Sequence, residues 1–210
     1  FRFIINVMDG IYQVKNHHFL TNNDIFKLEV ISHKKFDLVQ RILLIDLGNT
    51  QQLLEVINNT ETAIRVIEQT EEKNIIRRKS CIISSTNNIL AFANSKIYCI
   101  KLPLDVLSEI RDCKKGIGKI LLYHRLEIFK KITEIGYVEG LHIFKNYSLY
   151  HKENVICRIN EIFPLKINKY NKTECRICLL KVPKKTYNYD NTCVAASCNS
   201  FARQLGSLLF

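Results

Sequence analysis

The chain has 210 residues, of which 47% are hydrophobic, a content that fits one folded domain and excludes wholesale disorder. No apolar run approaches the ~20 residues that a membrane-spanning helix requires, and the short apolar stretch in residues 1–7 lacks a following cleavage site, so we expect neither a membrane span nor a signal peptide. The formal net charge is +11, but the basic residues are scattered in short clusters, as on a solvated surface. We therefore expect no nucleic-acid partner, although the same charge would steer an anionic small molecule.

The first clear elements are two helices and a strand. Apolar residues at helical spacing predict a helix over 36–44. A polar break follows, where Asn49 or Thr50 can cap a second helix that continues through Ile57. The β-branched residues of segment 63–67 then predict a strand.

The clearest local signal is a β-hairpin. Residues 75–84 and 89–102 are both strand-like, and the Ser-Thr-Asn-Asn sequence between them suits a turn. Because successive strand residues face opposite sides, Arg77 and Arg78 must point in opposite directions, and one of them is expected to reach the covered face of the sheet. A guanidinium there requires a carboxylate from the protein or from a ligand. The alternative is an exposed arginine or one in an ordinary ion pair.

Further along the chain the periodicity becomes helical. A short helix with an apolar residue at every third position is expected before Gly116 and Gly118, and this glycine pair could offer backbone N–H groups to an anion. An apolar stripe predicts a helix of about four turns over 117–132, which Gly136 ends. His124 lies on that stripe and is expected to be a packed, hydrogen-bonded core residue.

Two closing strands are predicted near the end of the domain, over 155–163 and 175–182. From about Tyr187 the composition shifts to Ser, Asn, Ala, Cys and Thr, so we expect residues 187–210 to be an appended, weakly ordered tail on a domain of residues 1–186. The order of the elements favours an α+β fold, an antiparallel sheet with helices packed against it.

Eight cysteines raise the question of disulfides or zinc. Irregular spacing without a secretion signal favours reduced thiols. Cys175 and Cys178, with Cys193 and Cys198, could bind zinc, and the first pair resembles the opening of a RING-type finger. Against this, no histidine follows His151, and strand positions three apart point to opposite faces. We expect no metal site; a zinc-stabilised domain that binds nucleic acid or protein is the remaining alternative.

Four stretches share a pattern with a known family. They are segment 43–55 with Leu-Leu-Ile-Asp-Leu-Gly-Asn-Thr, strand 78–82 with Arg-Lys-Ser-Cys-Ile, segment 116–137 with Gly-Ile-Gly-Lys-Ile-Leu-Leu, and the stretch from Ile156-Cys157-Arg158 to a strand ending at Pro183. In this order and spacing, over residues 36–183, the chain resembles the chorismate pyruvate-lyase family, in particular the branch encoded by cyanobacteria and algal plastids.

The resemblance implies a sheet of about six antiparallel strands with helices on one face. It implies a cofactor-free site that eliminates pyruvate from chorismate and releases 4-hydroxybenzoate, in a monomer located in the plastid stroma, or in the cytoplasm if the resemblance fails. It also implies a set of residues that bind the substrate, with Arg78 on a carboxylate and the others in the pocket wall: Arg78, Ile117, Gly118, Asn49, Thr50 and Arg158.

The chain departs from the family at two positions. The family has a glutamate four residues before the proline that closes the last strand, and here that position is occupied by Leu179, while Ile156 replaces a tryptophan of the family. Glu161 and Glu174 are the nearest acids, and regular alternation puts Glu174 on the face opposite to Leu179. The chain is therefore expected to be an active or impaired lyase. The alternative is a non-catalytic module that binds a small aromatic carboxylate on the same fold.

Overall fold

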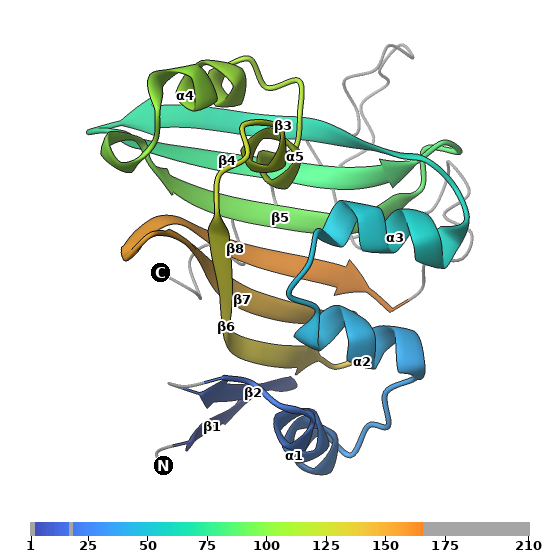
Figure 1. Cartoon of the computed structure of the whole chain (residues 1–210). Helices are drawn as coiled ribbons and strands as arrows, with labels where there is room; N and C mark the ends of the chain where they lie inside the picture. Colours follow the sequence, from blue (N-terminus) through green and yellow to red (C-terminus); the bar gives the residue numbers. More distant parts are fainter. Residues whose placement is uncertain (1–2, 17–18, 166–210) are drawn as a thin grey trace, which may run out of the picture. The chain divides into compact units, whose positions relative to one another are not determined.

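An antiparallel sheet of eight strands forms the centre of the part of the chain that the structure describes (Figure 1). The structure is a computed structural model, and it describes residues 3–16 and 19–165. The strands follow the order β1-β2-β6-β7-β8-β5-β4-β3, so the last described strand, β8, lies inside the sheet between β7 and β5. The strands are β1 (Phe3–Met8), β2 (Ile11–Asn16), β3 (Thr62–Glu72), β4 (Ile75–Ser84), β5 (Ile89–Tyr98), β6 (Ile128–Val138), β7 (His142–His151) and β8 (Asn154–Pro164).

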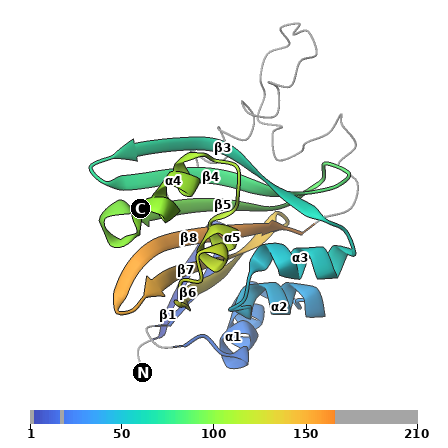
Figure 2. The same ribbon diagram turned by 45° about the horizontal axis from the view of Figure 1, so that its top comes forward.

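Helices cover one face of this sheet, the face turned to the viewer in Figure 1 and seen from above in Figure 2. Because each helix turns an apolar side to the sheet, the core lies between the two layers. Its fully buried members come from helices and strands alike: Ile25, Leu28, Leu44, Leu54, Ile76, Ile97, Val106, Ile110, Ile120 and Ile135. The helices are α1 (Asn22–Ser32), α2 (Leu38–Ile45), α3 (Thr50–Asn58), α4 (Leu104–Arg111) and α5 (Ile117–Tyr123), with a 3-10 turn η1 (Cys99–Lys101).

Side-chain caps fix the ends of the two helices predicted first. The Asp37 carboxylate accepts a hydrogen bond from the Gln40 backbone N–H at 2.8 Å and begins α2. The Asn49 side chain accepts from the Gln51 and Gln52 backbone N–H groups at 3.0 and 3.4 Å and begins α3. The two predicted helices are confirmed, as is the hairpin of β4 and β5. The short helix after the hairpin is confirmed as α4.

The prediction of one long helix over 117–132 was wrong. Helix α5 ends at Tyr123, and strand β6 begins at Ile128. Between them Arg125 adopts φ = 53°, a left-handed conformation that ends the helix. The apolar residues beyond it are mostly β-branched isoleucines, which a strand accommodates as well as a helix does. The apolar spacing alone could not distinguish the two.

Gly136 does not end a helix either, because it lies within strand β6. A Cβ atom at this position would collide with the ring of Phe144 on the neighbouring strand β7. The glycine is therefore needed for close approach of a side chain and not for a turn.

His124 does not lie on the apolar stripe of a long helix. It is the residue after α5, where its Nδ1 lies 3.0 Å from an Asp105 carboxylate oxygen and its Nε2 lies 3.0 Å from a Glu109 carboxylate oxygen. Both acids belong to α4, so the histidine links α5 to α4 through polar contacts.

The predicted sheet of about six strands was too small. The hairpin of β1 and β2 adds two strands beside β6, and β7 was not predicted from the sequence. The strand predicted over 155–163 is confirmed as β8. The strand predicted over 175–182 and the tail predicted over 187–210 lie outside the described residues.

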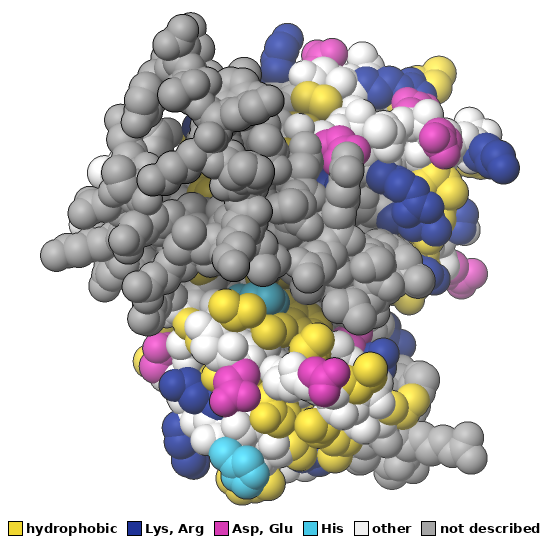
Figure 3. All heavy atoms as spheres, turned by 180° about the vertical axis from the view of Figure 1, so that it is seen from behind, with side chains coloured by type: hydrophobic (Ala, Val, Ile, Leu, Met, Phe, Trp, Pro, Cys, Tyr) yellow, Lys and Arg dark blue, Asp and Glu magenta, His cyan; other side chains and the backbone are white. Residues whose placement is uncertain are grey.

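Charged side chains of both signs are intermixed on the surface. In Figure 3, which shows the molecule from behind, lysine and arginine side chains lie beside aspartate and glutamate near the β3–β4 hairpin. Ion pairs among the described residues include Lys79 with Glu68 at 2.7 Å and Arg111 with Glu71 at 2.7 Å. Acidic neighbours therefore partly neutralise the basic residues of the surface. Within residues 3–16 and 19–165, no helix has both the length and the hydrophobicity to cross a membrane.

Candidate functional site

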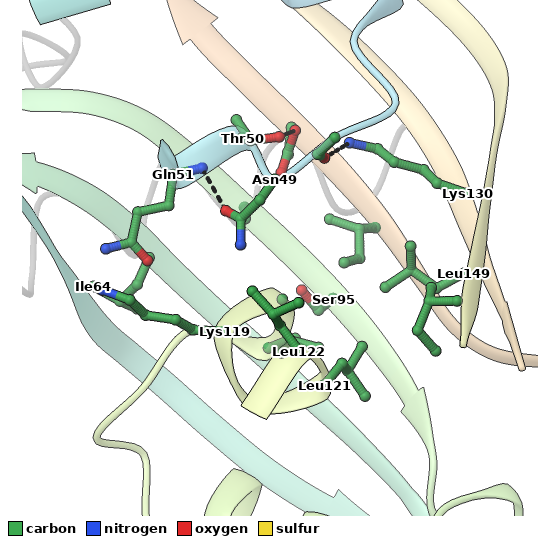
Figure 4. A pocket seen from close by; sticks show the side chains of 18 of the residues that line it. Asn49, Thr50, Gln51, Ile64, Ser95, Lys119, Leu121, Leu122, Lys130 and Leu149 are labelled. Atoms are coloured by element: carbon green, nitrogen blue, oxygen red, sulfur yellow. Dashed lines mark hydrogen bonds between the residues drawn. The ribbon is translucent and has the colours of Figure 1, made fainter. Parts of the chain in front are cut away.

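A cavity of about 390 Å³ lies between the front face of the sheet and the helices α3 and α5 (Figure 4). This volume is in the range of small-molecule sites. The strand residues that line it alternate along their strands, as expected for one face of a sheet. The lining comprises Leu47, Gly48, Asn49, Thr50, Gln51, Gln52, Ile64, Arg78, Ser80, Ile82, Ala93, Ser95, Gly116, Ile117, Gly118, Lys119, Leu121, Leu122, Leu126, Ile128, Lys130, Tyr147, Leu149, Ile159 and Glu161.

Arg78 is the buried cation on the β4 side of this cavity, with only 1% of its surface exposed, whereas Arg77 points to the other face and is exposed. Its Nε–H donates to the Gln69 side-chain oxygen at 2.7 Å. Its two terminal nitrogens donate to the backbone carbonyls of Lys115, at 3.1 Å, and of Ile110. Burial lowers the pKa of Arg78 from its usual value.

These contacts leave part of the guanidinium available. Arginine has five N–H donors, and the three hydrogen bonds made to Gln69, Lys115 and Ile110 use three of them. Among the described residues, no carboxylate forms an ion pair with Arg78. The Cys113 thiol also interacts with the guanidinium. Up to two N–H groups therefore remain for a ligand, enough for the two oxygens of a carboxylate.

Glu161 is the buried carboxylate of the cavity. It lies on β8 with 6% of its surface exposed. One oxygen accepts a hydrogen bond from the Tyr147 hydroxyl at 2.7 Å, and the other accepts from the Thr50 hydroxyl at 2.8 Å. The Lys145 amine lies 3.5 Å from the second oxygen. Contacts from β7 and from the start of α3 thus fix the carboxylate in one orientation.

The same neighbours keep Glu161 ionised. Burial by itself would raise the pKa of this carboxyl group, but the charges of Lys145 and Lys130 and the hydrogen bonds from Tyr147 and Thr50 outweigh it and hold the pKa below its usual value. Near neutral pH, Glu161 is therefore a hydrogen-bond acceptor and a base.

Two lysines and Asp46 complete the charged part of the site. Lys145 is fully buried, and its amine donates to the Asp46 backbone carbonyl at 3.3 Å. Lys130 donates to the Gly48 carbonyl at 3.0 Å, as Figure 4 shows. Each amine lies 3.9 Å from an oxygen of the Asp46 side chain. The two lysines of the sheet therefore hold the α2–α3 loop over the cavity.

Two glycines allow α5 to approach the cavity closely. A Cβ at Gly116 would lie 2.9 Å from a side-chain carbon of Ile64, so only glycine fits where α5 begins. A Cβ at Gly118 would lie 3.3 Å from the Asn49 side-chain nitrogen. Figure 4 shows the Asn49 amide directed toward the interior of the pocket. The predicted glycine pair therefore serves close packing.

Much of the remaining wall is apolar. Ile117, Leu121 and Leu122 of α5 line the cavity together with Leu149 and Ile159 of the sheet, and Ser80 and Ser95 add two hydroxyl groups. A largely apolar wall accommodates a ring, and the burial of Arg78 and Glu161 strengthens their charge interactions.

Most of the site residues predicted from the sequence meet in this cavity. Arg78, Ile117, Gly118, Asn49 and Thr50 all line it. The acid candidate Glu161 also lines it.

One predicted residue is not brought to the site. Arg158 is exposed and does not line the cavity, because it lies an odd number of residues from Glu161 on β8 and so points to the other face. Leu179 and Glu174 lie outside the described residues.

Sequence reasoning missed Lys130 and Tyr147. Lys130 was not identified because its segment was predicted to be a helix. A helix prediction does not say which face of the sheet a residue lies on. Tyr147 belongs to β7, which was not predicted at all. No period-2 signal marks β7, because residues on both of its faces are buried.

The potential metal ligands are not assembled in the part of the chain that is described. No group of three or more His, Cys, Asp or Glu side chains there could hold a metal ion. The four cysteines considered for zinc, from Cys175 onward, lie outside the described residues.

The fold and the cavity define an α+β protein with a pocket of small-molecule size, which a buried arginine and a buried glutamate both line. A family model described as chorismate pyruvate-lyase Rv2949c-like matches residues 44–171. The chain belongs to this family, and the resemblance seen in the sequence is confirmed. No curated protein matches the chain.

Proposed function

We propose that the protein eliminates pyruvate from chorismate to give 4-hydroxybenzoate. The observation that carries the proposal is the placement of Arg78 and Glu161, both almost fully buried, in the lining of one cavity between the sheet and the helices. The family match supports the choice of substrate.

The reaction requires little from the protein beyond binding chorismate and orienting its ring. A hydrogen leaves the ring carbon that bears the hydroxyl, the neighbouring carbon–oxygen bond to the enolpyruvyl group breaks, and the enol that departs takes up a proton to become pyruvate. The ring becomes aromatic, which drives the step. The protein must orient the ring, exclude water and place a proton-transferring group near the reacting carbons.

In this proposal Arg78 binds the ring carboxylate through its available N–H groups. The ring lies against the apolar wall of α5. Glu161 accepts a hydrogen bond from the ring hydroxyl and serves as the base near that carbon, since its pKa is held low and it is ionised. Tyr147 and Thr50 fix its orientation.

Glu161 also bears on whether the site is active. With Pro183 taken as the closing proline, the family's acid position is Leu179. Strand β8 itself ends in a proline, Pro164, but the residue four positions before it is Asn160, so this proline does not place Glu161 at the family position either. Glu161 nevertheless supplies a carboxylate to the cavity, and this favours an active lyase over an impaired one.

The test is incubation of the purified protein with chorismate. Pyruvate and 4-hydroxybenzoate should appear in equal amounts, measured by a coupled dehydrogenase assay and by absorbance. A protein that binds 4-hydroxybenzoate in a calorimeter but releases no pyruvate would be the non-catalytic module instead. Absence of both binding and turnover would contradict the proposal.

We further propose that the protein works as a monomer in the plastid stroma and takes no nucleic acid as partner. Size-exclusion chromatography with light scattering tests the oligomeric state, and a fluorescent fusion in algal cells tests the location.

A further inference from the structure

Lys130 enters the cavity from the side opposite to Arg78. Lys130 lies on β6 and Arg78 on β4, with β7, β8 and β5 between them. At about 4.8 Å between neighbouring strands, their Cα atoms are roughly 19 Å apart. Through the register of the sheet, Lys130 lies level with Ile76, only two residues along β4 from Arg78. The two long side chains therefore approach one ligand-sized space from its two ends.

The Lys130 amine also has N–H groups that make no hydrogen bond to the described residues. Its hydrogen bond in the described structure goes to the Gly48 carbonyl at 3.0 Å, and an ammonium group has three N–H donors. The nearest carboxylate oxygen, on Asp46, is 3.9 Å away, too far for a hydrogen bond. The Tyr147 ring lies under the amine, with its centroid 4.3 Å away.

Lys145 differs from Lys130 in its position and in the pairing of its charge. It is fully buried, it does not line the cavity, and it lies 3.5 Å from Glu161. Its charge is matched by Glu161, whereas the charge of Lys130 faces the cavity.

We propose that Lys130 binds the second carboxylate of the substrate, the one on the enolpyruvyl group, so that the pocket holds a dicarboxylate between Lys130 and Arg78. The inference rests on the proposed function for the identity of the ligand. Once the carbon–oxygen bond breaks, each product keeps one carboxylate and one cation: 4-hydroxybenzoate stays on Arg78 and pyruvate on Lys130. The pocket therefore selects a dianion over either product alone.

The pH dependence of ligand affinity provides a second test of the role of Lys130. The groups that face Lys130 are Asp46 of the α2–α3 loop, Lys145 and Tyr147 of β7, and Glu161 of β8. Burial and the charge of Lys145 lower the pKa of Lys130 to about 8, against the opposing effects of Glu161 and Asp46. The protonated amine binds the anion, so affinity for a dicarboxylate is retained below this pKa and lost as the pH rises through it.

The experiment compares two stable ligands, 3-(carboxymethoxy)benzoate and 3-methoxybenzoate, which share a ring carboxylate and differ in the second one. Neither has a phenol that would titrate near pH 9. In calorimetric titrations at pH 7, the wild type should bind the diacid more tightly. Lys130→Met should weaken diacid binding by about ten- to a hundredfold, the range for a hydrogen bond to a charged group, and change 3-methoxybenzoate binding by less than about twofold.

Lys119→Met is the matched control, because Lys119 is an exposed lysine that also lines the cavity and carries the same charge. It should leave both affinities nearly unchanged. Lys130→Arg, which keeps the charge, should retain most of the preference for the diacid. In the wild type, that preference should shrink between pH 7 and pH 9. If Lys130→Met does not fold, the Lys130→Arg variant and the wild-type pH series decide the question.

Three results would overturn the inference. The wild type could show no preference for the diacid, or Lys130→Met could weaken the binding of both ligands equally. The third is a Lys119→Met variant that loses the affinity for the diacid in place of Lys130→Met. The proposed function fails separately. If chorismate is not turned over but the diacid preference depends on Lys130, the dicarboxylate site stands and only the lyase activity is refuted.

Discussion

Replacing Arg78 by methionine should remove the ring-carboxylate site while keeping the aliphatic volume of the side chain. Up to two N–H groups of Arg78 are left for a ligand after its bonds to Gln69, Lys115 and Ile110. Each hydrogen bond to a charged group contributes about 1.5–3 kcal/mol, so a bidentate contact is worth at least about 3 kcal/mol. This corresponds to a loss of affinity of roughly a hundredfold or more for 4-hydroxybenzoate.

The variant should also be less stable. The carbonyls of Ile110 and Lys115 would lose a buried donor, and an unsatisfied buried polar group costs about 1–3 kcal/mol. Chemical denaturation measures this cost, and calorimetric titration below the unfolding range measures the affinity. Arg77→Met is the control, because Arg77 lies on the same strand but on the exposed face. A folded Arg78→Met protein that binds 4-hydroxybenzoate within about threefold of the wild type would refute the assignment of Arg78.

Three further substitutions test other parts of the structure. Glu161→Gln should lower turnover of chorismate by about 10²-fold or more, as expected for loss of a base. The control Glu134→Gln changes a buried acid that does not line the cavity, and it should lower turnover far less. Equal losses of turnover in the two variants would argue against a specific role of Glu161. Gly136→Ala should reduce the free energy of unfolding by about 1–3 kcal/mol through collision with the Phe144 ring, and an unchanged melting temperature would show that the strands can adjust. Asn49→Ala should cost about 1 kcal/mol by removing the cap of α3, and an unchanged denaturation midpoint would show that other groups replace the cap.

Local signals made the middle of the fold predictable from the sequence. The caps at Asp37 and Asn49 and the turn of the β4–β5 hairpin are fixed by residues within a few positions of one another. The segment after Tyr123 was different. Its isoleucines satisfy a helical spacing, and the strand forms because residues of β6 find partners on β7, the next strand along the chain, and on β2, which is far away in the sequence. Tertiary pairing of this kind overrides local periodicity.

A site residue could be predicted where the local sequence fixes the direction of its side chain. Two adjacent arginines on a strand must face opposite ways, so Arg78 could be singled out before the structure was known. Glu161 was only one of two acid candidates, because Glu161 and Glu174 are both near the family's acid position, which is occupied by Leu179. Lys130 could not be identified, because its contribution depends on its register with strands on the other side of the sheet.

The position of β8 has a consequence for how the molecule assembles. Strands β3, β4 and β5 form one block and β1, β2, β6 and β7 form another, and in the sheet they are joined only through β8. Until residues 154–164 have been synthesised, each block has an unpaired edge, at β5 and at β7. The two blocks become one sheet only when β8 pairs with both of them. The same strand carries Glu161, so closing the sheet and completing the charged lining of the cavity depend on one segment of the chain.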